Sequence, residues 1–248
     1  MIGATSRPIV IADRGASSEA PENTIAAFEL ALDQGADGLE LQVHLSLDDQ
    51  PVVIRDFTLE RTTDGAGLVR ARRLKELKRL DAGGWRGERF RGQRLQTLGE
   101  VLERFRDRTR FWIELPAGSE RYRGIEERVV SLVEIYDVLD RCLVQSSDRT
   151  TLDELRGLNR DLTLAARVVR AEPPDGVEGP GLVQALCAAA HGLTGPSVAA
   201  IRAAGFECYA WTVDEPALAS RLVGWGIDGI ISGQPGPIRA AIGHPDSS

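Results

Sequence analysis

Short apolar runs alternate along the chain with longer segments in which apolar residues recur at helical spacing. Residues 8–12 (PIVIA) and 36–43 (ADGLELQV) have the composition of strands. Between them, residues 22–35 place apolar side chains three and four positions apart, behind an Asn or Thr cap and ahead of a terminal glycine. The pattern therefore predicts a strand, a helix and a second strand in succession.

The alternation changes after the second strand. Too few residues separate it from the next apolar run, PVVI, for a parallel crossover, which needs about a dozen residues. Residues 39–56 are therefore predicted to form an antiparallel hairpin over a polar turn at Asp48 and Asp49. A turn centred there places Arg55 opposite Gln42.

Residues 57–98 contain turn sequences and a basic segment, and we interpret them as an insertion on top of a repeating βα unit. Alternation then resumes, with strands expected at 111–115, 142–146, 162–168, 206–213 and 228–232, helices at 123–139, 148–158, 197–205 and 215–226, and either a strand or a helix at 182–189. Without the hairpin arm this makes eight strands in a chain of barrel length, which is about 250 residues. The sequence thus predicts one α/β domain over residues 1–248, a TIM (β/α)8 barrel with a small inserted subdomain.

Composition narrows the class of protein. Hydrophobic residues make up 42% of the chain, which is enough for a full core, and no apolar run approaches the roughly 20 residues that span a bilayer. The first residues lead into a strand without a signal segment. The cysteines, Cys142, Cys187 and Cys208, lie far apart without metal-binding spacing, so we expect buried thiols in a cytoplasmic protein.

The formal net charge is −7, yet residues 55–110 carry 16 basic against 9 acidic side chains. Such a local excess draws anionic ligands to one side of a molecule. The alternative is a compositional bias, since 28 of the 30 basic residues are arginine. No aromatic stacking pattern or recognised motif accompanies the charge, so we expect no nucleic-acid partner.

Polar side chains follow the predicted strands at the end where barrel enzymes carry their active sites. They are Asp13, Arg14, Glu40, Gln42, Arg55, Asp56, Glu114, Gln145, Ser146, Trp211 and Asp214. Several carboxylates and two arginines on one rim predict a polar pocket. A structural network of ion pairs would produce the same set of residues.

Several motifs recur in order along the chain and resemble the glycerophosphodiester phosphodiesterase family. The resemblance extends over roughly residues 8–238 and is carried by IADRGASSEAPENTIAAFELALDQGADGLELQVHLSLDDQPVVIRDFTLERTTDGAG (11–67), GERFRGQRLQTLGEVL (87–102), WIELP (112–116) and YAWTVDEPALASRLVGWGIDGIIS (209–232). It implies a TIM barrel that hydrolyses phosphodiesters.

The resemblance also implies a site. One divalent cation, Mg²⁺ or Ca²⁺, would be held by Glu40 and Glu114, with Gln42 in place of a third, acidic ligand. Two family histidines act as general base and general acid. The positions that match the family's other site residues, which help to bind substrate, are Arg14, Glu22, Asp56 and Trp211.

The departures from the family pattern concern proton transfer. Asp13 and Arg55 stand where the family shows its two histidines, and Pro116 and Gly233 differ as well. Arginine keeps its proton near neutral pH, and an aspartate of ordinary pKa is a weak base. Losing a general acid or base costs about 10²–10⁴-fold in rate. A neutral amide at Gln42 also weakens a site for a hard cation.

Three hypotheses follow. The first is a family-derived protein that has lost hydrolase activity and still binds a phosphorylated or other anionic small molecule. The second is an active metal-dependent phosphodiesterase in which Asp13 or His44 replaces the histidines. The third is a non-catalytic structural or partner-binding barrel whose pocket is filled by its own ion pairs.

His44 is a candidate for the second hypothesis because strand alternation puts it on the same face as Glu40 and Gln42. The alternative is a histidine on the rim in contact with water. The candidate catalytic positions are therefore Asp13, Arg55 and His44.

Overall fold

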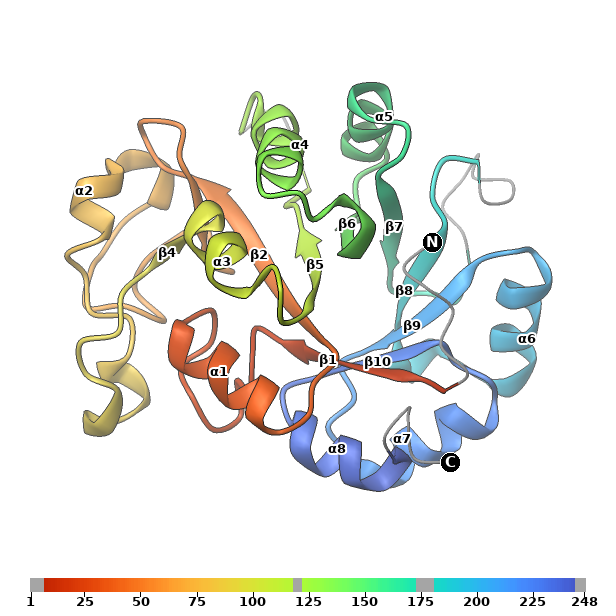
Figure 1. Ribbon diagram of the computed structural model, residues 1–248. Helices are drawn as coiled ribbons and strands as arrows, with labels where there is room; N and C mark the ends of the chain where they lie inside the picture. Colours follow the sequence, from red (N-terminus) through yellow and green to blue (C-terminus); the bar gives the residue numbers. More distant parts are fainter. Residues whose placement is uncertain (1–6, 118–121, 173–180, 244–248) are drawn as a thin grey trace.

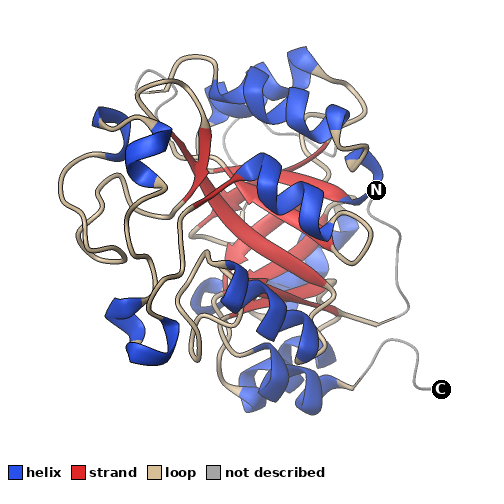
Figure 2. Cartoon of the chain, turned by 60° about the vertical axis from the view of Figure 1, so that its left-hand side comes forward, coloured by secondary structure: helices blue, strands red, loops and turns tan. Residues whose placement is uncertain are grey.

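The computed structural model describes residues 7–117, 122–172 and 181–243. Within these residues, eight parallel strands close into a barrel with helices packed around the outside (Figures 1 and 2). The first strand pairs with both the second and the last, which closes the sheet. The predicted TIM barrel is confirmed.

The barrel strands are β1 (Ile9–Asp13), β2 (Gly38–Leu45), β5 (Arg110–Glu114), β6 (Cys142–Ser146), β7 (Thr163–Val168), β8 (Ala185–Ala189), β9 (Glu207–Trp211) and β10 (Gly229–Ser232). The outer helices are α1 (Ile25–Asp33), α3 (Leu98–Phe105), α4 (Ile125–Ile135), α5 (Arg149–Leu158), α6 (Gly195–Ala203), α7 (Pro216–Gly224) and α8 (Pro235–Ile242). The segment with two possible readings, 182–189, contains a strand, and α3 and α8 were not predicted as separate helices.

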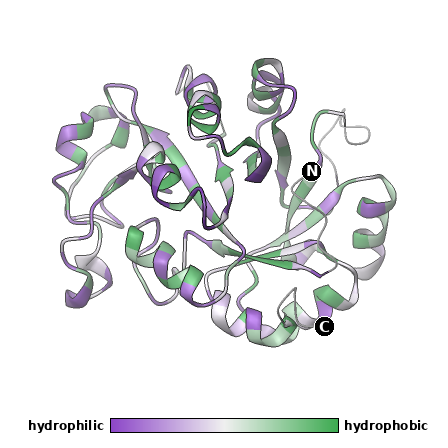
Figure 3. Ribbon diagram, in the orientation of Figure 1, coloured by the Kyte–Doolittle hydropathy of each residue, from purple (hydrophilic) through white to green (hydrophobic). Residues whose placement is uncertain are grey.

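The helices cover the barrel with one apolar face each, so hydrophobic and hydrophilic residues alternate along them (Figure 3). In α3, Leu98, Val101, Leu102 and Phe105 are buried at the spacing of a single helical face. Thr97 begins this helix, because its hydroxyl accepts from the N–H of Glu100 while the Glu100 carboxylate accepts from the N–H of Thr97. Within the described residues, no helix combines the length and the apolar character needed to cross a bilayer.

The hairpin is present, but its predicted register was wrong by one residue. Strand β3 (Pro51–Val53) pairs antiparallel with β2, and Val43 lies opposite Val53. The N–H of Ile54, not of Arg55, donates to the carbonyl of Gln42 over 3.0 Å. Because side chains alternate between the two faces of a strand, the one-residue difference moves Arg55 away from the side chain of Gln42.

The hairpin extends the carboxyl end of β2 beyond the barrel. Strand β4 (Gln96–Thr97) adds to β3, and the short helix α2 (Leu74–Leu77) lies in the segment between them. This part of the chain has a small core separate from that of the barrel, made by Val52, Ile54, Leu59, Val69, Leu77, Ala82 and Leu95. The predicted insertion, 57–98, therefore carries apolar packing of its own.

Two aromatic side chains fill the amino-terminal part of the barrel interior. Trp112 on β5 and Tyr209 on β9 are buried and meet edge to face, with ring centroids 5.6 Å apart. Neighbouring strands make room for them with glycine. A Cβ at Gly38 would lie 2.5 Å from Trp112 Cζ3, and one at Gly229 would lie 2.7 Å from Tyr209 Cδ1.

The same four-residue pattern, glycine–any–aspartate–glycine, begins two barrel strands at their amino ends. Asp37 and Asp228 each accept a backbone N–H from an adjacent strand, Val10 over 2.7 Å and Cys208 over 2.8 Å. Each is also paired with an arginine from an outer helix, Arg239 for Asp37 and Arg202 for Asp228. The N–H of Ile9 donates to the carbonyl of Asp228, so both segments hold β1 in place.

The packing at Gly38 is open to a direct test. Gly38→Ala is expected to lower the free energy of unfolding by about 1–3 kcal/mol, because the added methyl overlaps the buried Trp112 ring. Gly157→Ala is the matched control. That glycine lies exposed in α5 with open space around it, so alanine should raise stability by up to about 1 kcal/mol. Urea unfolding measures both, and equal effects would contradict the steric argument.

Candidate functional site

A cavity of about 710 Å³ lies at the carboxyl ends of the barrel strands. This is the end at which barrel proteins bind ligands. The lining includes seven of the eleven residues predicted from the strand ends, but not Glu40, Gln145, Ser146 or Asp214. The seven are Asp13, Arg14, Gln42, Arg55, Asp56, Glu114 and Trp211, and the rest of the lining is His44, Phe57, Thr58, Pro116, Ala117, Arg167 and Thr212.

Strand alternation explains why polar groups collect here. Inward-facing positions recur at every second residue, so Gly38, Glu40 and Gln42 of β2 share one face. On β5 the same face carries Trp112 and then Glu114. Strands β2 and β5 thus each contribute a glycine or an apolar residue nearer the amino end of the barrel and a polar residue nearer the carboxyl end.

Asp13 forms the floor of the cavity with the side chains that surround it. Arg14 Nε donates to Asp13 Oδ1 over 2.8 Å, Arg14 Nη2 donates to Oδ2 over 3.1 Å, and the Thr212 hydroxyl donates to Oδ2 over 3.1 Å. Burial alone would raise the pKa of Asp13, but the hydrogen bonds and charge of Arg14 prevail and lower it to about 2. Asp13 is therefore ionised and bound at neutral pH.

Glu40 lies beside Asp13 in the parallel register of β1 and β2 and is completely buried. Complete burial and the charge of Asp13 hold its pKa well above the ordinary range, and Arg167 only partly offsets them. Of these two neighbouring carboxyl groups, Glu40 is the one that binds a proton more readily. Its buried Oε2 has no hydrogen-bond partner among the described residues, an environment that suits an uncharged, protonated oxygen.

Arg167 was missed by the sequence analysis, although it is central to the site. Its Nη1 lies 3.2 Å from Glu40 Oε1 and its Nε lies 3.1 Å from Glu114 Oε1. The guanidinium carbon sits 3.7 Å from the centre of the Trp211 ring, close enough for a cation–π contact. The alternation of side chains along β7 could have identified it. Arg167 lies two residues after the inward-facing Ala165 and therefore on the same face, near the carboxyl end of the strand.

Gln42 links Glu114 to the loop that follows β1. Its Nε2 donates to Glu114 Oε2 over 3.1 Å, and its Oε1 accepts from Asn23 Nδ2 over 3.2 Å. The predicted cation ligands, Glu40, Gln42 and Glu114, thus lie together, but protein donors contact all of their side-chain oxygens except Glu40 Oε2. Among the described residues, no three His, Cys, Asp or Glu side chains gather in a way that would hold a metal ion.

A second set of ion pairs, made by Glu22 and Arg61, is joined to the cavity lining through Arg14 and Asp56. Glu22 accepts from both terminal nitrogens of Arg61 over 2.7 Å each and from Arg14 Nη1 over 3.0 Å. Arg61, which sequence reasoning also missed, binds Asp56 as well. Glu22 and Asp56, predicted to contact substrate, are therefore engaged with arginine, and the donors of Arg14 are divided between Asp13 and Glu22.

Arg55 differs from the other arginines of the pocket in its freedom. Its side chain is 54% exposed, and its one ion pair within the described residues, with Asp56, spans 3.5 Å. That pair is too long and too exposed to hold the guanidinium firmly. Arg55 is thus the cation at the mouth of the cavity with the most unused donors.

His44 is not in contact with water at the rim, because it is buried with 2% of its surface exposed. Its Nε2 lies 2.9 Å from the carbonyl oxygen of Arg55 and its Nδ1 lies 3.0 Å from the Tyr122 hydroxyl. A carbonyl only accepts, so Nε2 carries the hydrogen and Nδ1 accepts from Tyr122. Burial lowers the pKa of His44, which favours this neutral form.

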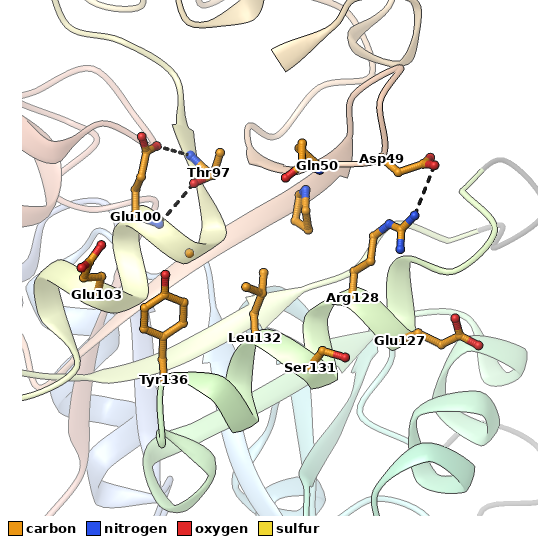
Figure 4. A pocket seen from close by; sticks show the side chains of 12 residues that line it. Asp49, Gln50, Thr97, Glu100, Glu103, Glu127, Arg128, Ser131, Leu132 and Tyr136 are labelled. Atoms are coloured by element: carbon orange, nitrogen blue, oxygen red, sulfur yellow. Dashed lines mark hydrogen bonds and ion pairs between the residues drawn. The ribbon is translucent and has the colours of Figure 1, made fainter. Parts of the chain in front are cut away.

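A second hollow of about 600 Å³ lies outside the barrel, between the hairpin, α3 and α4 (Figure 4). Its polar side chains are largely paired with one another or with the backbone. Asp49 pairs with Arg128 over 3.2 Å, and Glu100 is occupied by the start of α3 and by Lys78. None of the residues predicted for the site lines this hollow.

Comparisons with known proteins agree with the fold. The chain is 36% identical over 241 residues to a glycerophosphodiester phosphodiesterase of Caldanaerobacter subterraneus, covering 92% of this chain and 95% of that protein. An Oleispira antarctica phosphodiesterase, solved in complex with the product sn-glycerol-3-phosphate, superposes with a TM-score of 0.88 at 31% identity, over 95% of this chain and 97% of that one.

A glycerophosphodiester phosphodiesterase from Agrobacterium tumefaciens is similar as well, with a TM-score of 0.82 at 29% identity over 94% of this chain and 99% of that one. The model of the glycerophosphoryl diester phosphodiesterase family matches residues 14–236, which include every barrel strand except β1. The chain belongs to the glycerophosphoryl diester phosphodiesterase family.

Proposed function

We propose that this member of the family is impaired as a hydrolase and that its pocket binds a small phosphorylated molecule. The observation that carries the proposal is the state of the three candidate catalytic side chains. None of them combines a free hydrogen-bonding atom in the cavity with a pKa near neutrality, which efficient proton transfer requires.

Asp13 is the weakest base of the three positions. Arg14 lowers its pKa to about 2, so protonation by a reacting group would have to displace a bidentate ion pair. Arg55 presents a guanidinium group, which donates hydrogen bonds but has no acceptor atom to serve as a base. His44 has both ring nitrogens occupied by protein atoms, so it would have to break a hydrogen bond before it could accept or donate a proton.

The cavity supports the binding half of the proposal. A volume of about 710 Å³ is sufficient for a small ligand. The third hypothesis requires a pocket that is filled by its own ion pairs, and this volume argues against it. Arg55 and Arg167 line it with positive charge. The Oleispira antarctica relative was solved with sn-glycerol-3-phosphate, and a phosphate monoester of this kind is the ligand that we propose for this chain.

The second candidate function is an active metal-dependent phosphodiesterase, and several relatives are named glycerophosphodiester phosphodiesterases. What favours it is that Asp13 and Glu114 lie close enough to Glu40 for their charges to raise its pKa. It would require a metal-bound water or Asp13 to transfer the proton. The hydrolysis assay described below separates it from the first proposal.

Binding should depend on the exposed arginine. Arg55→Ala is expected to weaken the affinity for sn-glycerol-3-phosphate roughly tenfold or more, because hydrogen bonds to a charged group contribute about 1.5–3 kcal/mol. Isothermal titration calorimetry measures the change. Arg91→Ala serves as the control, since Arg91 is comparably exposed (65%) but pairs with Glu88 on the surface. Equal weakening by both variants would point to a general effect of charge.

Hydrolysis of glycerophosphodiesters should be undetectable with Mg²⁺, Ca²⁺ or Mn²⁺, each tested separately. The physical reason is the absence of a poised acid and base, which together supply several powers of ten in rate. A Glu40→Ala/Glu114→Ala variant is assayed alongside. Turnover that requires a metal and disappears in this variant would refute the loss of activity and support the second candidate.

The buried neutral histidine should make stability depend on pH. Its pKa is lower in the folded state than the ordinary value near 6.5, so the unfolded chain binds more protons and stability falls as the pH drops below about 6.5. His44→Gln should remove this part of the dependence, since glutamine does not titrate. Urea unfolding at pH 7.5 and 5.5 tests it. A wild-type curve that differs from the variant by the same amount at both pH values would show that His44 is not held neutral.

A further inference from the structure

A guanidinium group lies between the two carboxylates that the family resemblance assigns to a divalent cation. Arg167 reaches Glu40 and Glu114 at 3.2 and 3.1 Å, from a side chain that is only 17% exposed. Bonds from Mg²⁺ or Ca²⁺ to oxygen are about 2.0–2.6 Å long. A metal ion bound to these same two oxygens would need the space that the guanidinium fills.

The hydrogen bonds that these carboxylate and amide oxygens accept also make them less available to coordinate a metal ion. Glu40 Oε1 accepts from Gln145 Nε2 over 2.7 Å in addition to Arg167, and Glu114 Oε2 accepts from Gln42. The third predicted ligand, Gln42, brings no charge and has its oxygen bound to Asn23. The residues present therefore do not fit a divalent cation while Arg167 is in place.

Arg167 is fixed in its position but keeps unused hydrogen-bond donors. Trp211 covers one face of the guanidinium at 3.7 Å and is itself anchored, because its Nε1 donates to the carbonyl of Cys187 over 2.8 Å. The carboxylates engage Nε and Nη1. Within the described part of the chain, Nη2 donates to no protein acceptor, and the side chain lines the cavity.

We propose that Arg167 is the resident cation of this pocket, in the place of a divalent metal. Its charge neutralises the inward-facing acids, and its free N–H groups bind the phosphate of the ligand without a metal bridge. The identity of the ligand rests on the proposed function. The replacement of the metal does not, and the two parts are tested by different measurements.

The first measurement concerns the ligand. Titration of the wild-type chain with sn-glycerol-3-phosphate should give the same affinity, within about twofold, in EDTA and in Mg²⁺, Ca²⁺ or Mn²⁺. Arg167→Gln should weaken that affinity about tenfold or more. Binding that vanishes in EDTA would overturn the proposal. Absence of binding under every condition would overturn the proposed function and the ligand-binding role of Arg167, but not the replacement of the metal.

The second measurement concerns the metal alone and uses Tb³⁺, whose luminescence is excited by a nearby tryptophan. Trp211 lies beside the site, so an ion between the carboxylates would be detected. Wild type should show no such emission. Arg167→Gln, which removes the guanidinium, should gain emission that Ca²⁺ competes away and that the added changes Glu40→Gln and Glu114→Gln abolish. Arg167→Lys keeps a positive charge and should gain none.

Emission from wild type that is as strong as that from Arg167→Gln would overturn the proposal, and so would no gain in a folded Arg167→Gln. Circular dichroism establishes whether the variants fold. If Arg167→Gln does not fold, the wild-type chain still decides the question. An unfolding midpoint that Ca²⁺ or Mg²⁺ leaves unchanged supports a resident guanidinium, and a midpoint that either ion raises overturns it.

Discussion

The site depends on one electrostatic constraint: carboxylates removed from water must be protonated or paired with cations. Asp13, Glu40 and Glu114 face one another at the top of the barrel, and two arginines and one proton satisfy them. Arg14 forms an ion pair with Asp13, and Arg167 contacts Glu40 and Glu114. Through these contacts the side chains at the floor of the cavity hold one another in position. The arrangement of the floor therefore follows from charge balance as much as from packing.

Much of the fold could be read from the sequence because the barrel repeats a simple periodicity. Strands such as 142–146 agree with the structure to the residue. The errors lie where periodicity carries no information. The hairpin register depends on the geometry of a short turn, in which Asp49 has a positive φ of 58°, and spacing alone did not place it. Helix α8 was missed because prolines occupy the first and third of its eight positions, which leaves only a short apolar pattern.

The site shows a similar division. Strand ends identified half of the residues that line the cavity, since barrel topology brings them together whatever their order in the chain. The sequence could not tell which of them would be free. Arg14 and Glu22 were expected to contact substrate, yet both are held in ion pairs, and Arg61, which holds Glu22, comes from a loop with no periodic signal. Pairing between side chains depends on distances that only the folded chain defines.

The paired aspartate segments at the amino end of the barrel bear on how the protein is made. Asp37 and Asp228 hold the first strand from its two sides, one from the second strand and one from the last. Because β1 precedes the other barrel strands along the chain, one of its edges stays open until the last barrel strand, β10, has been synthesised. Barrel closure waits for residues 228–232, and until then β1 exposes unpaired backbone groups of the kind that promote association between chains.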